Sequence, residues 1–334
     1  MMGTYGFAGS TDNLKIFAGR HNRPLAESVC AQIGIRVGEA RTNVFPDGEL
    51  LIRLEEDVRG RDCYVVISTC QPVNDNLLET LIFCDCLKRA SAERVTVVMP
   101  YFGYGRQDRK DQGRVPITAK LVANMITAAR ADRVLAVDLH AAQIQGFFDL
   151  PMDHLSATPL FRDYFEGIRD ELGELCLVSP DVGNVKVAEG VANLLDADLA
   201  IINKKRLSGT EITTGHIIGS VEGKTVLMID DMISTAGTVC EAARVVTEQG
   251  ARDVMVAATH PLLVGKAIEN IHASPISRVV VSNTVPLPPD KVLAPIAERI
   301  VQLDIGPLVG EAIHRIHNNA SVSALFEGTV ITKL

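Results

Sequence analysis

The sequence repeats one local pattern four times: a segment with helical spacing of apolar residues, a short polar break containing Arg, and a run rich in β-branched residues. The four runs cover residues 95–98, 134–137, 254–257 and 279–281. Each pattern predicts a helix followed by a strand, and the lack of alternation is typical of a strand covered on both faces. Strands that alternate with helices form parallel units. We therefore expect an α/β fold with mostly parallel sheets flanked by helices.

The pattern also indicates two similar domains. Residues 87–105 and 246–265 both pass from a helix through a strand to a Pro-containing loop that ends at Gly. A length of 334 residues is typical of about two domains. We expect three segments: a flexible leader over 1–13, an N-terminal domain over 14–155 and a C-terminal domain over 156–334.

Composition limits the classes of partner. The formal net charge of −8 argues against nucleic acid as the main partner, because affinity for phosphate backbones depends on a basic surface. No apolar run reaches membrane-spanning length, and the first residues do not resemble a secretory signal. The seven cysteines form no CxxC pair, which is typical of small buried hydrophobes in a reducing compartment. We expect a cytoplasmic protein without a membrane partner.

Residues 225–238 predict the kind of ligand that is bound. An apolar strand over 226–229 is followed by Asp230 and Asp231, at the carboxyl end of a strand where ligand sites of open α/β sheets usually lie. Residues 234–238 are small and rich in hydroxyl groups, and they lead into a predicted helix over 239–249. Backbone N–H groups at a helix start bind phosphate. The alternative is that Ser234 or Thr238 only caps the helix.

The two carboxylates favour a ligand over a simple cap. They would repel an anion unless a divalent metal or sugar hydroxyls lay between them and it. In an extended strand Asp230 and Asp231 point to opposite faces, so we expect one of them to face the ligand directly. A sugar phosphate meets these requirements.

Two further segments carry groups that suit a nucleotide. Residues 101–111 follow a predicted strand and pass from aromatic to basic, so that Arg106 or Arg109 could bind phosphate; the alternative is a solvated charged loop. The sequence Phe-Pro-Asp-Gly-Glu at 45–49 has the chemistry of a turn, and its aromatic and acidic groups could also bind adenine.

Three polar segments have weaker signals. His140 and Asp181 follow apolar runs and could ligate a divalent metal, although their spacing carries no motif and each alone is more often structural. Lys204 and Arg206 precede an aperiodic stretch that extends to Gly219. That stretch indicates either a loop that closes over phosphates or a solvated basic turn.

Together these segments resemble the ribose-phosphate pyrophosphokinase family over residues 14–326. The resemblance depends on 45–49, 101–111, 138–141, 143–147, 179–181, 204–206 and 226–238. The last segment alone is shared with phosphoribosyltransferases. The resemblance implies two phosphoribosyltransferase-like domains and transfer of the β,γ-pyrophosphoryl group of ATP to the 1-hydroxyl of ribose 5-phosphate. It also implies Mg²⁺ as cofactor and a homo-oligomer, specifically a hexamer.

The resemblance also implies a role for each matching residue. Lys204 and Arg206 would be catalytic, and His140 and Asp181 would bind Mg²⁺. ATP would be held by Phe45, Asp47, Gly48, Glu49, Arg106 and Gln107. Ribose 5-phosphate would be held by Arg206, Asp230, Asp231, Ser234, Thr235, Ala236, Gly237 and Thr238.

The chain departs from the family pattern in a few positions. Ser234 stands where Asp is usual, Asn184 replaces a Gly, and Gly105 replaces a common Ala. Ser234 and Asn184 leave open a non-catalytic regulatory homologue that binds nucleotide. A phosphoribosyltransferase is a further alternative, but such an enzyme does not need the ATP-type segments at 45–49 and 106–107.

Overall fold

The N-terminal half is built on a five-stranded parallel sheet. The computed structural model describes residues 9–180, 185–203, 206–208, 211–212 and 216–326. The sheet has the strand order β1-β4-β5-β6-β7. Its strands are β1 (Leu14–Ala18), β4 (Asp62–Val66), β5 (Arg94–Met99), β6 (Arg133–Val137) and β7 (Met152–Leu155). An antiparallel hairpin of β2 (Ala40–Val44) and β3 (Leu50–Leu54) lies outside this sheet.

The C-terminal half is built on a seven-stranded sheet in the order β12-β9-β8-β13-β14-β15-β16. Every pair in it is parallel except β12 with β9. Its strands are β8 (Leu175–Ser179), β9 (Asp198–Asn203), β12 (His216–Ile218), β13 (Thr225–Ile233), β14 (Asp253–Pro261), β15 (Arg278–Ser282) and β16 (Ile300–Leu303). A small hairpin pairs β10 (Arg206–Ser208) with β11 (Glu211–Ile212). The predicted α/β architecture with two mostly parallel sheets is confirmed.

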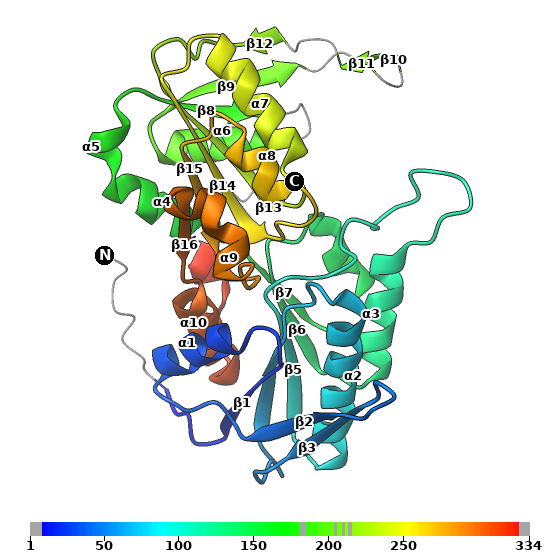
Figure 1. The fold of residues 1–334 in the computed structure, drawn as a ribbon. Helices are drawn as coiled ribbons and strands as arrows, with labels where there is room; N and C mark the ends of the chain where they lie inside the picture. The colour runs from blue at the N-terminus through cyan, green and yellow to red at the C-terminus, as the bar shows by residue number, and fades with distance from the viewer. Residues whose placement is uncertain (1–8, 181–184, 204–205, 209–210, 213–215, 327–334) are drawn as a thin grey trace.

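Helices cover both faces of each sheet (Figure 1). The helices in the first half are α1 (Arg23–Ile33), α2 (Val73–Arg89) and α3 (Thr118–Ala128). The later ones are α4 (Thr158–Gly167), α5 (Arg169–Leu172), α6 (Val185–Leu194), α7 (Gly237–Glu248), α8 (Ala267–His272), α9 (Asp290–Leu293) and α10 (Gly306–His317). Within the described residues, no helix is both long enough and apolar enough to cross a membrane.

Alternate side chains of the central strands enter different cores. In β4, Cys63 and Val65 pack with residues of α2 and α3, whereas Tyr64 and Val66 pack with residues of α1 and α10. Both faces are therefore apolar, which explains why the sequence shows continuous β-branched runs instead of alternation. The four predicted helix-to-strand junctions are confirmed, because β5, β6, β14 and β15 each follow a helix at the expected positions.

The last helix packs on the N-terminal half. The predicted domain boundary after residue 155 lies between β7, which ends at Leu155, and α4, which starts at Thr158. However, α10 packs against α1 and contributes to the core beneath the first sheet. The end of the predicted leader also contacts this region, since the Ser10 N–H donates to Asn318 Oδ1 at 3.1 Å. The chain thus crosses between the halves more than once.

The close approach of α10 to α1 requires glycine. A Cβ added to Gly306 would lie 2.0 Å from Ser28 Oγ and 2.6 Å from Ser28 Cβ. Ser28 cannot rotate away freely, because its hydroxyl donates to Asp304 Oδ2 at 2.5 Å. The two helices can therefore pack at this distance only when position 306 has no side chain.

We predict that Gly306→Ala lowers the free energy of unfolding by about 1–3 kcal/mol, the usual cost of an added methyl group in a packed interface. Urea denaturation measures the change. Gly167→Ala is the matched control, because its Cβ would meet no atom within 4 Å and its stability should be unchanged or slightly higher. Equal stability of Gly306→Ala and the control would contradict the predicted packing.

Candidate active site

The two sheets meet at the carboxyl ends of their strands through buried polar contacts. Asp138 follows β6, and Thr259 and His260 lie near the end of β14. The Thr259 hydroxyl donates to Asp138 Oδ2 at 2.6 Å, and His260 Nε2 lies 3.0 Å from the Asp138 carbonyl oxygen. Thr259 and His260 are almost fully buried. These bonds fix the end of one sheet against the end of the other.

Further contacts extend this connection between the sheets. We call the whole connection the polar joint, and it consists of Asn22, Ser68, Asp138, Thr259, His260 and Thr284. The Asn22 amide donates to Ser68 Oγ at 3.1 Å and to the carbonyl oxygens of Asn283 and Thr284 at 3.0 and 3.1 Å. Asn22 and Ser68 follow β1 and β4, whereas Thr284 follows β15. The joint therefore spans several strands of both sheets.

The hydrogen bonds of His260 place a proton on Nε2. A carbonyl oxygen can only accept, so Nε2 must carry the proton that it donates to Asp138. The second ring nitrogen, Nδ1, lies 2.9 Å from Thr284 Oγ1, whose hydroxyl also donates to the Thr259 carbonyl oxygen at 2.7 Å. Burial lowers the pKa of His260, which favours the neutral ring with its proton on Nε2.

The joint brings His140 to Asp231. Asp138 has a φ of +35°, which is sparsely populated for a residue with a side chain and has to be held by its surroundings. Two residues later, His140 Nδ1 lies 2.6 Å from Asp231 Oδ2 on β13. The structure thus joins predicted site residues from the two halves that are 91 positions apart in the chain.

This pair has defined electrostatics. The hydrogen bond to Asp231 raises the pKa of His140, with burial acting in the opposite direction. Burial alone would raise the pKa of Asp231, but the hydrogen bond and charge of His140, together with the contacts to Asp230 and His260, outweigh burial and lower it. Since Nδ1 donates to the carboxylate, Nε2 is the nitrogen that remains available to a ligand.

The hydroxyl-rich loop at 234–238 lies directly after β13. It leads into α7 through Ala236, whose φ of +61° is left-handed. Among the described residues no side chain forms a capping hydrogen bond at this helix start, so the simple cap interpretation of Ser234 or Thr238 is wrong. The first N–H groups of α7 point out of the helix without an intrahelical partner. They suit an oxyanion.

The predicted nucleotide segment 101–111 lies beside His140. A Cβ on Gly105 would lie 3.7 Å from His140 Cβ, and the Gln143 amide donates to Asp108 Oδ2 at 2.9 Å. Gln107 Oε1 accepts from the Thr118 hydroxyl at 2.5 Å. The Arg106 segment is therefore close to the centre where His140 and Asp231 meet.

Other predicted residues lie elsewhere. Phe45, Asp47, Gly48 and Glu49 form the turn of the β2–β3 hairpin, which lies across the lower end of the N-terminal half in Figure 1, far from β13. Phe45 is 45% exposed. Asp181 and Lys204 lie outside the described residues, and Arg206 is described only as the first residue of β10.

The chain matches proteins of one family along nearly its full length. Residues 14–129 match the N-terminal domain of ribose phosphate pyrophosphokinase, and residues 180–327 match the phosphoribosyl synthetase-associated domain. A ribose-phosphate pyrophosphokinase of Rhodopirellula baltica is 54% identical over 94% of this chain and 98% of its own length. This chain belongs to the ribose-phosphate pyrophosphokinase family.

Other members of the family agree in sequence and in fold. A ribose-phosphate pyrophosphokinase of Bacillus subtilis is 48% identical over 94% of this chain and 97% of its own length. The crystal structure of phosphoribosylpyrophosphate synthetase from Mycobacterium smegmatis is similar with a TM-score of 0.86 and 40% identity, covering 92% of this chain and all of that one. The resemblance noted from the sequence motifs is confirmed.

Sequence analysis missed Thr259, His260 and Thr284. A usable signal was present, because Thr259 and His260 follow the β-branched run at 254–257 just as Asp230 and Asp231 follow the run at 226–229. The rule that polar residues at strand ends gather at one sheet edge applies equally to both pairs.

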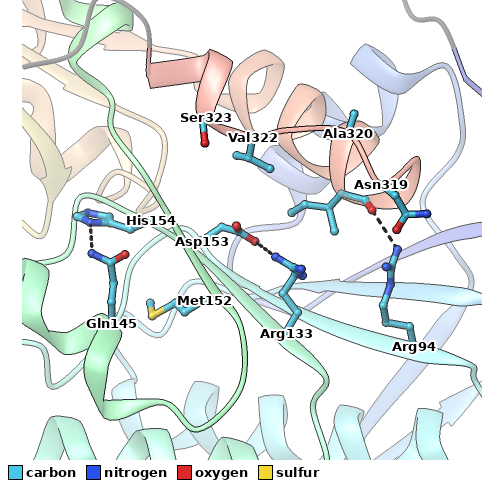
Figure 2. A pocket seen from close by; sticks show the side chains of 11 residues that line it. Arg94, Arg133, Gln145, Met152, Asp153, His154, Asn319, Ala320, Val322 and Ser323 are labelled. Carbon is cyan, nitrogen blue, oxygen red and sulfur yellow. Dashed lines mark hydrogen bonds and ion pairs between the residues drawn. The ribbon is translucent and has the colours of Figure 1, made fainter. Parts of the chain in front are cut away.

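A separate cavity of about 430 Å³ lies between β5, β6 and β7 and the segment that follows α10 (Figure 2). Arg133 in its wall pairs with Asp153 at 2.5 Å, and Arg94 donates to the Ile316 carbonyl oxygen at 3.3 Å. His154, also in the wall, accepts from the Leu139 N–H at 2.8 Å. None of the residues predicted for the substrate site lines this cavity.

We predict that His260 makes stability depend on pH. The pKa of His260 is lowered in the folded protein, so below about pH 6.5 the unfolded chain binds a proton that the folded chain does not. The free energy of unfolding therefore decreases as the pH decreases. Replacement by glutamine removes this titration. The Tm deficit of metal-free His260→Gln relative to the unmutated protein should be largest near pH 8 and shrink towards pH 5.

Ser282→Ala is the control for this comparison. It removes a buried hydrogen bond to the Thr259 carbonyl oxygen in the same region without removing a titratable group. Its Tm deficit should be similar at every pH. A deficit of His260→Gln that is just as constant would contradict a buried neutral histidine in the joint.

Proposed function

We propose that this chain transfers the β,γ-pyrophosphoryl group of ATP to the 1-hydroxyl of ribose 5-phosphate, giving 5-phospho-α-D-ribose 1-diphosphate and AMP. The observation that carries the proposal is the meeting of His140 from the first half with Asp231 from the second, 2.6 Å apart. They lie beside a loop whose backbone suits a phosphate and beside the Arg106 segment. Membership of the ribose-phosphate pyrophosphokinase family supports the same reaction.

In this proposal the sugar phosphate lies along the end of β13. The N–H groups and hydroxyls of Ser234, Thr235, Ala236, Gly237 and Thr238 hold the 5-phosphate. The extended backbone continues through the two acids, because β13 ends at Ile233. Asp231 faces His140, which leaves Asp230 on the other face of the strand to contact the ribose hydroxyls.

The donors at the centre fit Mg²⁺. In the described residues no cluster of three or more acidic, His or Cys side chains could form a full cage. Mg²⁺ does not need one, because it usually keeps several waters and binds one or two protein groups plus substrate phosphates. His140 held by Asp231, together with Asp181, would supply such a partial set. The ion would neutralise charge on the ATP phosphates.

Lys204 and Arg206 are the proposed catalytic residues. They carry positive charge that can stabilise the oxygens of the transferring group, and phosphoryl-type transfer depends mainly on such positioning and neutralisation. Asp231 supports the same step indirectly by fixing the ring of His140.

We predict that Lys204→Ala lowers kcat about 100-fold or more while the KM for ATP changes little, because a donor that acts in the transition state contributes little to ground-state binding. Initial rates of AMP release measure both constants. Lys224→Ala removes an equivalent charge that pairs with Asp198 at 2.5 Å and is the control. An unchanged kcat for Lys204→Ala rules out the catalytic role.

The predicted ATP site requires a second copy of the chain. Phe45 to Glu49 lie on the β2–β3 hairpin, far from β13 in Figure 1. Arg106 and Gln107 instead follow Gly105, whose added Cβ would lie 3.7 Å from His140 Cβ. One ATP can contact both sets only if the hairpin of one protomer reaches the centre of another. We therefore propose a homo-oligomer, a hexamer by resemblance to the family, in which neighbouring protomers share each active site.

This sharing predicts complementation between two inactive variants. The double variant Phe45→Ala, Glu49→Ala lacks the hairpin contacts, and His140→Ala lacks the centre. After mixing, unfolding and refolding together, roughly a quarter of the sites would combine an intact hairpin with an intact centre. Activity should rise to about that fraction of the unmutated enzyme. Mixed oligomers with no more activity than the separate variants would contradict shared sites.

The overall reaction is tested with purified protein, ATP, ribose 5-phosphate and Mg²⁺. AMP that forms only when the sugar phosphate is present supports the synthetase. Nucleotide binding without AMP favours the regulatory homologue that Ser234 and Asn184 leave open.

We also propose a cytoplasmic location for the enzyme, which the seven free cysteines support because such thiols persist in a reducing compartment.

A further inference from the structure

The connection between β14 and α8 fixes the loop proposed to bind the 5-phosphate. Three consecutive carbonyl oxygens before Ala236 accept hydrogen bonds, two from this connection and one from α8. The N–H groups of Leu263 and Val264 donate to Ile233 and Ser234, each at 3.0 Å. The Asn270 side-chain amide donates to the carbonyl oxygen of Thr235 at 2.9 Å.

These bonds direct the peptide groups of the loop. In a trans peptide the N–H points away from the carbonyl oxygen, so a carbonyl oxygen held from one side leaves the N–H of the next residue facing the opposite side. The loop then enters the left-handed conformation at Ala236, with φ of +61°, which a residue with a Cβ adopts only when its surroundings hold it there. Ala236 itself is buried, so the strained turn is packed as well as hydrogen-bonded.

Asn270 is the one of these three donors that is a side chain. The Leu263 and Val264 donors are backbone groups, which a substitution leaves in place. Asn270 lies on α8, whose Ala267 and Ile271 are fully buried in the C-terminal core, so the amide is presented from a fixed element. The bond spans 35 positions in the sequence and ends one residue before the strained turn.

We propose that Asn270 is a positioning residue for the sugar-phosphate site. It acts through the Thr235 carbonyl oxygen: by holding that peptide, it keeps the N–H groups of the loop and of the start of α7 aimed at the 5-phosphate. This inference depends on the proposed function, because it assumes that residues 234–238 bind that phosphate. Asn270 itself does not contact the substrate.

The expected effect is selective. Loss of one partly exposed hydrogen bond leaves the Thr235 carbonyl oxygen to water and changes overall stability little. A loop that is no longer held must be ordered when phosphate binds, which weakens that binding. Ribose 5-phosphate binding should therefore suffer, whereas ATP, proposed to bind at the hairpin and the Arg106 segment, should be unaffected.

The proposal is tested with Asn270→Ala. Glu269→Ala is the control, because it alters the neighbouring exposed residue of the same helix. Asn270→Ala should raise the KM for ribose 5-phosphate about three- to tenfold, the range of one net hydrogen bond. The KM for ATP and kcat should stay within about twofold of the control, and the Tm of the free protein should stay within about two degrees of it. An unchanged sugar-phosphate KM, or equal shifts of both KM values, overturns the positioning role.

A binding measurement separates this inference from the proposed reaction. Ribose 5-phosphate and inorganic phosphate are titrated against each protein, and the rise in Tm is recorded. If the unmutated protein binds ribose 5-phosphate without forming AMP, the proposed reaction fails, but weaker binding by Asn270→Ala still supports the positioning role. If the unmutated protein binds neither compound, both proposals are overturned.

Discussion

The polar joint between the two sheets is the constraint on which the site depends. Parallel strands place their loops at one sheet edge, and here two such edges face each other, so the loops of both halves converge. Such a contact buries strand ends rich in polar groups, each of which costs about 1–3 kcal/mol if it lacks a partner. Asp138 avoids this cost by accepting from Thr259, His260 and the Ala157 N–H. The same bonds set the direction of the segment that carries His140.

Apolar packing reinforces the joint. One core cluster contains residues of β1 and β6 together with residues of β8, β13 and α10, so it extends from one sheet to the other without a break. At the joint itself, Tyr101 from the first half packs edge-on against the His260 ring, with centroids 5.0 Å apart. Rotation of one half against the other would break both kinds of contact. The two halves are therefore held in a fixed relation at the joint.

Strands and helices that depend on local periodicity could be predicted from the sequence. Contacts that depend on how the two halves pack against each other could not. The β-branched runs located β5, β6, β14 and β15, and the acids after residue 229 located the strand end at which His140 arrives. No local pattern reports which strand ends face each other, so the partnership of Asp138 with His260 was not predicted. The position of α10 was missed for the same reason, since its contact with α1 depends on the small size of Gly306. The hairpin turn was recognised as a turn, but its distance from β13 is a property of the whole fold.

The charge of the chain adds a condition on how the site works. Two anionic substrates must bind a protein of net charge −8, at strand ends that carry Asp230 and Asp231. Among the described side chains predicted for the site, the positive charge comes from Arg106 and from His140 when it is protonated, and Asp231 balances the latter. Backbone N–H groups supply only partial charge at the start of α7. In the proposed reaction, Mg²⁺ on ATP and the basic residues at 204–206 would supply further neutralisation. The proposed site would then attract both anions most strongly when the metal and these basic residues are present, which would couple substrate binding to assembly of the catalytic charges.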